Sequence, residues 1–268
     1  MRGRVLIVAG SDSGGGAGIQ ADIKTVSMLD AYASTAITAL TAQNTEGVFD
    51  VLPIPPEFIR RQIEVVLDDI GADVIKTGML HDAAVIEAIA AVLRDRGPAI
   101  PLVVDPVMAA KGGARLIEAA AIDALRRRLI ARAEVVTPNL PEAEILCGGP
   151  IRDVAEMQAA GESLLALGCR AALVKGGHLS GDIVSDVLVT AVGVRVWESP
   201  RIATRNTHGS GCTLASAIAT GLAQGFGIET AVDRARLYVQ QAIASAPGLG
   251  RGYGPLDHAH PLREGSAA

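Results

Sequence analysis

Long apolar runs are missing from this sequence of 268 residues. Although 49% of the residues are hydrophobic and the mean hydropathy is +0.34, no run reaches the roughly 18–20 apolar residues that a membrane-spanning helix needs. The N-terminus passes from Arg4 directly into a short strand-like segment, without the cleavage site of a secretory signal peptide. The sequence therefore predicts a soluble, cytoplasmic protein with no membrane partner.

Concentrated positive charge and aromatic residues are also scarce. The chain has 24 Lys and Arg against 29 Asp and Glu, a net charge of -5, and only 3% of its residues are aromatic. Its longest basic run, Arg126–Arg128, falls in a helical pattern whose charged face is expected to lie in solvent. A nucleic-acid-binding protein needs a denser basic surface or a base-stacking platform, so we predict no nucleic-acid partner.

Cysteine is rare as well. Cys147, Cys169 and Cys212 are widely spaced, odd in number and without a CxxC motif. This pattern excludes a disulfide framework and a structural zinc site, and it fits a reducing compartment.

Apolar periodicity predicts strands and helices in alternation. The expected strands cover residues 4–9, 32–40, 73–76, 101–105, 134–137 and 171–175. One expected helix begins near residue 17, and the others cover residues 58–69, 82–94, 118–132, 154–167, 211–224 and 228–246. Such alternation is typical of a mostly parallel sheet that is covered by helices on both faces.

A hairpin interrupts this alternation late in the chain. Two β-like segments within residues 184–196 flank Val192-Gly193, which predicts an antiparallel edge. The chain length fits one domain over residues 1–268, with a loose tail from about residue 256. We therefore predict an α/β fold, a doubly wound α/β/α sandwich whose mostly parallel sheet carries an antiparallel edge hairpin.

Four polar, glycine-rich segments fall where strands end, which is where ligands of open α/β sheets bind. The first covers residues 10–18. It lacks both the glycine spacing of a dinucleotide-binding loop and the Lys-Ser/Thr pair of a phosphate-binding loop. It can bring its backbone close to a small ligand, or it can form a plain tight turn.

Two further segments carry carboxylates. Asp105 follows an apolar strand and can hold Mg²⁺ or cap a turn, and the flexible Gly112-Gly113 beyond it suits a lid. Glu142 stands three residues after Asn139, where it is either an ordinary first-turn acid or part of a metal and phosphate motif.

The fourth segment, residues 206–212, is rich in small residues and directly precedes a predicted helix. Backbone N–H groups and the helix dipole make such a start an anion site, although a glycine-rich start can also be purely structural. Together with the upstream Lys175, itself either a phosphate ligand or a surface lysine, this is the strongest chemical signal in the chain.

Eight stretches of the sequence resemble one family, the ribokinase-like small-molecule kinases. Within that family they are most similar to the hydroxymethylpyrimidine/phosphomethylpyrimidine kinases. They occur in order along nearly the whole chain, at residues 9–25 (AGSDSGGGAGIQADIKT), 38–48, 76–80, 105–113 (DPVMAAKGG), 137–144, 174–178, 205–219 (RNTHGSGCTLASAIA) and 253–256. The resemblance implies ATP-dependent phosphorylation of 4-amino-5-hydroxymethyl-2-methylpyrimidine and then of its monophosphate, for thiamine biosynthesis. It also implies Mg²⁺ and a homodimer.

The resemblance also assigns roles to residues. Gln43 would hydrogen-bond the aminopyrimidine, because its amide offers both a donor and an acceptor. The rest of that pocket would comprise Asp22, Gly10, Met79 and Val107, although Met79 and Val107 are also typical core residues. Mg²⁺ and the ATP phosphates would be arranged by Asp105, Asn139, Glu142 and Thr207. The transferred phosphoryl group would be stabilised by Lys175, Gly209, Ser210 and Gly211.

Cys212 stands where the sugar kinases of this superfamily place an aspartate base. A helix N-terminus and nearby cations favour its thiolate, so Cys212 is a candidate base; the alternative is a buried thiol that only shapes the pocket.

Two other functions compete with this one. A pyridoxal kinase of the same fold would phosphorylate another hydroxymethyl heterocycle. However, residues 107–112 lack the cysteine that the corresponding segment carries in some bacterial relatives with that activity. A non-catalytic pyrimidine-binding regulator is less consistent with the intact phosphate-site residues Asp105, Glu142 and Lys175.

Overall fold

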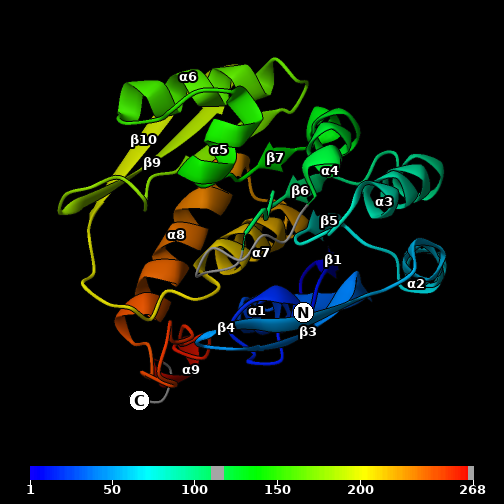
Figure 1. Cartoon of the computed structure of the whole chain (residues 1–268), viewed down its shortest axis with the longest axis horizontal. Coiled ribbons are helices and arrows are strands. Elements are labelled where there is room, and N and C mark those ends of the chain that lie inside the picture. Colours follow the sequence, from blue (N-terminus) through cyan, green and yellow to red (C-terminus); the bar gives the residue numbers. More distant parts are fainter. Residues whose placement is uncertain (110–117, 265–268) are drawn as a thin grey trace.

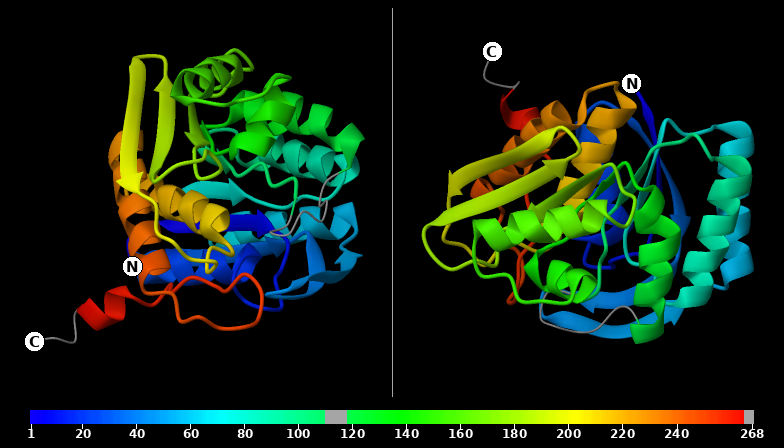
Figure 2. Two further views of the ribbon diagram at one scale, coloured as in Figure 1. Left: turned by 60° about the vertical axis from the view of Figure 1, so that its left-hand side comes forward. Right: turned by 90° about the horizontal axis from the view of Figure 1, so that it is seen from above.

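A computed structural model describes residues 1–109 and 118–264 of the chain. An eight-stranded sheet runs through the molecule between two layers of helices (Figures 1 and 2). The strands are β1 (Arg4–Ala9), β2 (Tyr32–Ile37), β5 (Val74–Thr77), β6 (Leu102–Val104), β7 (Val135–Val136), β8 (Ala171–Lys175), β9 (Ile183–Thr190) and β10 (Gly193–Pro200). Their order is β10-β9-β8-β7-β6-β5-β1-β2.

Strand pairing follows the predicted pattern. The pairs from β2 to β8 are parallel, whereas β9 and β10 form an antiparallel hairpin at one edge. The α/β sandwich with an antiparallel edge hairpin is thus confirmed. The chain first moves from β1 to β2 and then returns to the other side of β1 to form β5, which creates a topological switch point between β1 and β5.

Both faces of the sheet are apolar because its strands are buried on both sides. Along β1, Val5, Ile7 and Ala9 join one core cluster, and Leu6 and Val8 join the opposite one. The first face is covered by α1 (Gly18–Met28), α7 (Ser210–Ala223) and α8 (Ile228–Ala244). The second is covered by α2 (Pro56–Asp69), α3 (Ala83–Arg96), α4 (Ala119–Ala124), α5 (Leu140–Cys147) and α6 (Val154–Leu165).

One expected strand is wrong. Residues 32–40 do not form a single strand, because the chain leaves the sheet at Thr38, whose hydroxyl donates to the Met79 carbonyl at 2.6 Å. The chain then forms a separate hairpin of β3 (Ala39–Asn44) and β4 (Gly47–Pro53), which contacts the loop before α1, where the Ser13 hydroxyl donates to the Gln43 carbonyl at 2.8 Å. Periodicity did not predict this hairpin.

Two further expectations need correction. The helix expected over residues 118–132 continues past α4 as one π turn, Leu125–Leu129, and one 3-10 turn, Ile130–Arg132. Residues 256–260, expected to belong to a loose tail, are instead packed: Leu256, His258 and His260 are buried, and the Tyr238 hydroxyl donates to the His258 carbonyl at 2.7 Å. A short helix, α9 (Pro261–Glu264), follows. Within the described part of the chain, no helix is both long and apolar enough to cross a membrane.

Candidate active site

The predicted site residues gather at the carboxyl ends of the parallel strands. Gly10 follows β1, Met79 follows β5, Asp105 follows β6, and Lys175 ends β8. The N-terminus of α7 faces this edge, since a Cβ atom placed on Gly211 would lie 3.1 Å from Lys175 Nζ. Five loops that are far apart in sequence therefore meet at one place.

Lys175 and Asp105 form the charged centre of the site. Lys175 Nζ lies 3.2 Å from Asp105 Oδ1, and the Thr137 hydroxyl donates to the same oxygen at 3.3 Å. Asp105 is 2% exposed and the Lys175 side chain 14% exposed. A cation and an anion that are sheltered but still reachable from solvent suit a site that binds charged phosphates.

Asn139 and Glu142 form a capping box at the start of α5. The Glu142 N–H donates to Asn139 Oδ1 at 3.0 Å, and the Asn139 N–H donates to Glu142 Oε2 at 2.8 Å. The Asn139 side chain is thus occupied by the helix. Burial raises the pKa of Glu142 to about 7; the nearby Asp105 acts in the same direction, and Lys175 opposes it.

The raised pKa of Glu142 makes the stability of the fold depend on pH. Between about pH 4.5 and pH 7 the folded state holds a proton that the unfolded state has released, so the free energy of unfolding should fall as the pH rises through this range. Urea unfolding at several pH values should show a smaller fall in Glu142→Gln. The exposed Glu162→Gln is the control, and a variant curve parallel to wild type across this range would contradict the assignment.

The turn before α7 is shaped by Gly209. This residue has φ +81°, and a Cβ atom there would overlap the Gly16 carbonyl oxygen. The Ser210 N–H donates to the Thr207 carbonyl at 3.3 Å, so Thr207 acts on the turn through its backbone. The helix geometry leaves the N–H groups of Gly211 and Cys212 without intrahelical acceptors, so these two remain for an anion.

Cys212 differs from its expectation. Burial raises the pKa of its thiol to about 12, although the nearby Lys76 acts to lower it. The predicted preference for thiolate is therefore wrong, because the cost of removing the thiolate from water outweighs the helix dipole and the cations. Cys212 is a protonated thiol at neutral pH.

A protonated thiol is a poor base. We expect Cys212→Ser to lower kcat by less than about tenfold and to leave the acidic limb of the pH–rate profile in place. Alkylation of Cys212 by iodoacetamide, followed by peptide mass mapping, should accelerate only in strongly alkaline solution. A limb that shifts in the serine variant would restore Cys212 as the base.

Asp22 lies beneath the site in a fully buried ion pair. Both of its carboxylate oxygens are 2.9 Å from Lys76 Nζ, and the Ser216 hydroxyl donates to Oδ1 at 2.7 Å. Asp22 and Lys76 are 0% exposed. The structure thus places Asp22 behind the pocket surface, with Ser216 one helical turn after Cys212.

Asp12 organises the glycine-rich loop. Its carboxylate accepts from the N–H groups of Gly14, Gly16 and Ala17 at 2.8–3.1 Å, and it lies 2.8 Å from His208 Nε2. Burial acts to raise the pKa of Asp12, but these hydrogen bonds lower it.

Gln43 stands on β3, half-buried, at a bulge between Ala42 and Gln43. Its amide nitrogen lies 3.4 Å from His208 Nε2. Met79 and Gly10 are neighbours, since a Cβ atom on Gly10 would lie 3.1 Å from the Met79 sulfur. Val107 is half-buried beyond β6, and the lid expected at Gly112-Gly113 falls outside the described residues.

Similarity to known proteins identifies the family of the chain. Residues 12–257 match the family described as phosphomethylpyrimidine kinase. The chain belongs to this family.

Individual relatives point the same way. A bifunctional thiamine biosynthesis protein, ThiED, of Geobacter sulfurreducens is 54% identical over 96% of the chain, and the chain spans 52% of that relative's length. A hydroxymethylpyrimidine/phosphomethylpyrimidine kinase of Streptomyces coelicolor is 46% identical over 97% of the chain and 96% of the relative. The crystal structure of an ADP complex of Bacillus subtilis pyridoxal kinase superposes with a TM-score of 0.89 at 35% identity, covering 98% of this chain and 100% of that one.

Three residues that shape the site of this phosphomethylpyrimidine kinase family member were not predicted from the sequence. Asp12, Lys76 and His208 lie within quoted motifs, but nothing local distinguishes them from ordinary loop or strand residues. The available signal was that each is a charged or titratable residue within two positions of a glycine. Their roles depend on partners 54 to 196 residues away.

Proposed function

We propose that this kinase transfers the γ-phosphoryl group of ATP to the hydroxymethyl group of 4-amino-5-hydroxymethyl-2-methylpyrimidine, and then phosphorylates the monophosphate to the diphosphate. The observation that carries the proposal is the meeting of Lys175, Asp105 and Gly211 at one sheet edge. Phosphoryl transfer depends on positioning and on charge stabilisation rather than on covalent chemistry, and this arrangement provides both.

In the proposed reaction each group has a separate task. Lys175 and the free N–H groups of Gly211 and Cys212 stabilise negative charge on the transferred phosphoryl group. Gln43 binds the heterocycle from the β3–β4 hairpin, with Met79 and Val107 as apolar walls. Thr207 and Gly209 hold the anion-binding turn in shape.

Mg²⁺ is the proposed metal. In the described ranges, no three His, Cys, Asp or Glu side chains form a group that could hold a metal ion by themselves. Mg²⁺ commonly uses one or two carboxylates together with substrate phosphates and water, and the neighbouring Asp105 and Glu142 fit this need. The ion would supply charge neutralisation to the phosphates, and Asn139 would keep Glu142 in place.

Pyridoxal is the second candidate substrate, because the shape of the chain closely matches a pyridoxal kinase. The greater identity to a relative named for the pyrimidine reaction favours the pyrimidine. Steady-state kinetics with MgATP and each alcohol should give a kcat/KM for the pyrimidine that is at least about tenfold higher, the difference of one well-placed interaction. A higher value for pyridoxal would overturn this substrate assignment.

We also propose a cytoplasmic homodimer. Three free thiols suit a reducing compartment. Leu40, Phe49 and Leu52 are exposed on the β3–β4 hairpin and would be covered by a second subunit. Light scattering during gel filtration should report twice the 27.5 kDa chain mass.

A further inference from the structure

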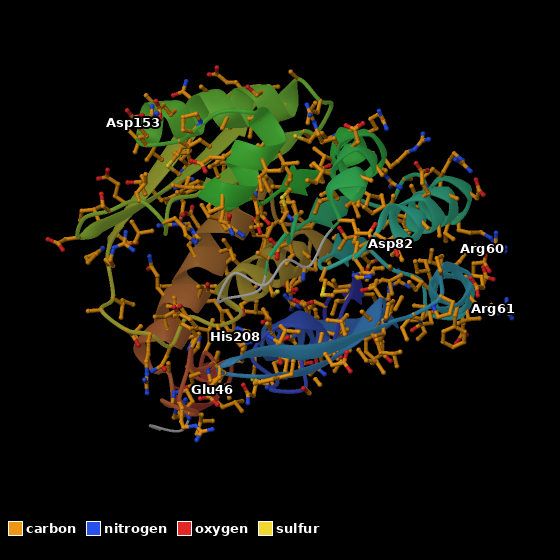
Figure 3. The ribbon with its side chains drawn as sticks, viewed as in Figure 1. Glu46, Arg60, Arg61, Asp82, Asp153 and His208 are labelled. Carbon is orange, nitrogen blue, oxygen red and sulfur yellow. The ribbon has the colours of Figure 1, made fainter. Side chains whose placement is uncertain are left out.

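Three distant segments meet at the imidazole of His208. His208 precedes α7, Asp12 lies in the loop after β1, and Gln43 is on β3; Figure 3 labels His208 where the segment before α7 approaches the hairpin. His208 Nε2 is 2.8 Å from Asp12 Oδ2 and 3.4 Å from Gln43 Nε2. His208 is only 7% exposed, so these contacts are sheltered from water.

Packing and a backbone hydrogen bond also restrain His208. The backbone N–H of His208 donates to the Gly254 carbonyl at 3.1 Å, and a Cβ atom on Gly16 would lie 2.6 Å from His208 Cδ2. Pro255 presses on the same glycine, at 3.0 Å from that Cβ position. The ring is therefore packed closely against Gly16, and the His208 backbone is tied to the tail at Gly254.

Hydrogen-bond roles determine where the His208 proton lies. The Asp12 carboxylate is an acceptor with a lowered pKa, so Nε2 must carry a hydrogen and donate it to Asp12. A nitrogen that carries a hydrogen cannot accept from the Gln43 amide. The near end of that amide must therefore be its oxygen.

The contact of Thr41 with the other end of the Gln43 amide requires the same orientation. The Thr41 hydroxyl lies 2.9 Å from the Ser11 carbonyl, which can only accept, and 3.3 Å from the Gln43 amide. Since its single hydrogen is used on Ser11, Thr41 offers only lone pairs to Gln43 and requires the amide nitrogen there. With nitrogen toward Thr41, that contact becomes a hydrogen bond. With oxygen toward His208, the amide shares the Nε2 hydrogen with Asp12, as the longer branch of a three-centre bond.

We propose that His208, held by Asp12, is a positioning residue that fixes the orientation of the Gln43 amide and thereby determines which order of donor and acceptor the substrate heterocycle must present. The inference rests on the proposed function, in which Gln43 contacts the substrate ring. One amide N–H and one oxygen lone pair remain for the ligand, in a fixed order. An amino group beside a ring nitrogen can satisfy both, whereas a ring without that pair leaves one of them unmatched.

The test compares two substitutions of His208. His208→Leu removes the donor, whereas the His208→Gln side chain can place an N–H near the Nε2 position. We expect His208→Leu to raise the KM for the pyrimidine alcohol about tenfold while kcat and the KM for ATP change less than about threefold, and His208→Gln to stay within about threefold of wild type throughout. Gln43→Ala should match His208→Leu in KM.

His260→Leu is the matched control, because His260 is another buried histidine that packs on Tyr238 away from this contact. Equal KM values for the pyrimidine in wild type and both His208 variants would overturn the positioning role and leave the proposed function intact. Equal losses in the leucine and glutamine variants would also overturn it, because they would indicate a purely structural role. Failure of the wild-type protein to phosphorylate the alcohol would overturn the proposed function and this inference with it.

Discussion

Replacing Lys175 by methionine is expected to lower kcat by about 10²–10³-fold, the usual loss when one preorganised group that stabilises transition-state charge is removed. Lys175 Nζ lies against both Asp105 and the start of α7, so it is the side-chain cation at the place where phosphoryl charge would develop. Methionine keeps the length and the apolar stem but cannot donate. Coupled assays with MgATP and the pyrimidine alcohol would measure the loss.

Arginine provides the comparison for this experiment. Lys175→Arg keeps the charge but spreads it over a planar fork, so we expect it to recover only part of the rate. Circular dichroism of both variants should resemble wild type, whereas Lys175→Met should melt at a lower temperature than Lys175→Arg, because Asp105 is 2% exposed and loses its cationic partner in the methionine variant. A methionine variant that retains more than about a tenth of kcat would remove Lys175 from the phosphate site.

Replacing Lys76 by methionine is expected to lower the free energy of unfolding by about 3–5 kcal/mol, because it leaves the Asp22 carboxylate buried without its partner. Both side chains are 0% exposed, and Ser216 alone would remain as a donor to Asp22. Asp22 raises the pKa of Lys76 against the effect of burial, and Lys76 in turn opposes the rise that burial causes in the pKa of Asp22, so the two charged forms stabilise each other. Urea unfolding at pH 7 would measure the change.

The double variant separates charge from packing. Lys76→Met combined with Asp22→Leu replaces the pair by apolar groups, and such replacements are often neutral or stabilising by about 1–4 kcal/mol. We expect the double variant to recover most of the lost stability. A single variant that loses less than about 1 kcal/mol would show that the pair is not electrostatically important to the fold.

The sheet and its helices could be predicted because each depends on a local apolar pattern. Residues 4–9 and 171–175 were predicted as strands with the bounds the structure gives, since short β-branched runs bounded by polar or glycine residues leave few alternatives. The antiparallel β9–β10 edge was also predicted correctly, because two β-like segments flank Val192-Gly193; the turn itself lies at residues 191–192.

The β3–β4 hairpin could not be predicted in the same way. In the sequence, Thr38 continues the apolar pattern of a strand. In the structure the chain turns there, where the Thr38 hydroxyl donates to the Met79 carbonyl and the Thr38 carbonyl accepts from the Ile54 N–H. Gln43 owes its place to this turn. The motif predicted that Gln43 was special but not that it would face His208.

The charge states of the site residues depend on burial, which cannot be read from the local sequence. A helix N-terminus next to cations predicted a thiolate at Cys212, and burial reverses that preference. From the sequence, Lys76 looks like an ordinary strand lysine. In the structure it pairs with Asp22 of α1, which in turn accepts from Ser216 of α7. Tertiary partners, rather than local pattern, determine these charge states.

The most direct measurement is mass spectrometry of the products formed from 4-amino-5-hydroxymethyl-2-methylpyrimidine and MgATP, with a parallel reaction on pyridoxal. The account predicts that the monophosphate accumulates first and the diphosphate follows, with ADP formed once for each phosphoryl group transferred, and that both products are lost together in Lys175→Met. If pyridoxal phosphate forms while the pyrimidine is recovered unchanged, the account is contradicted.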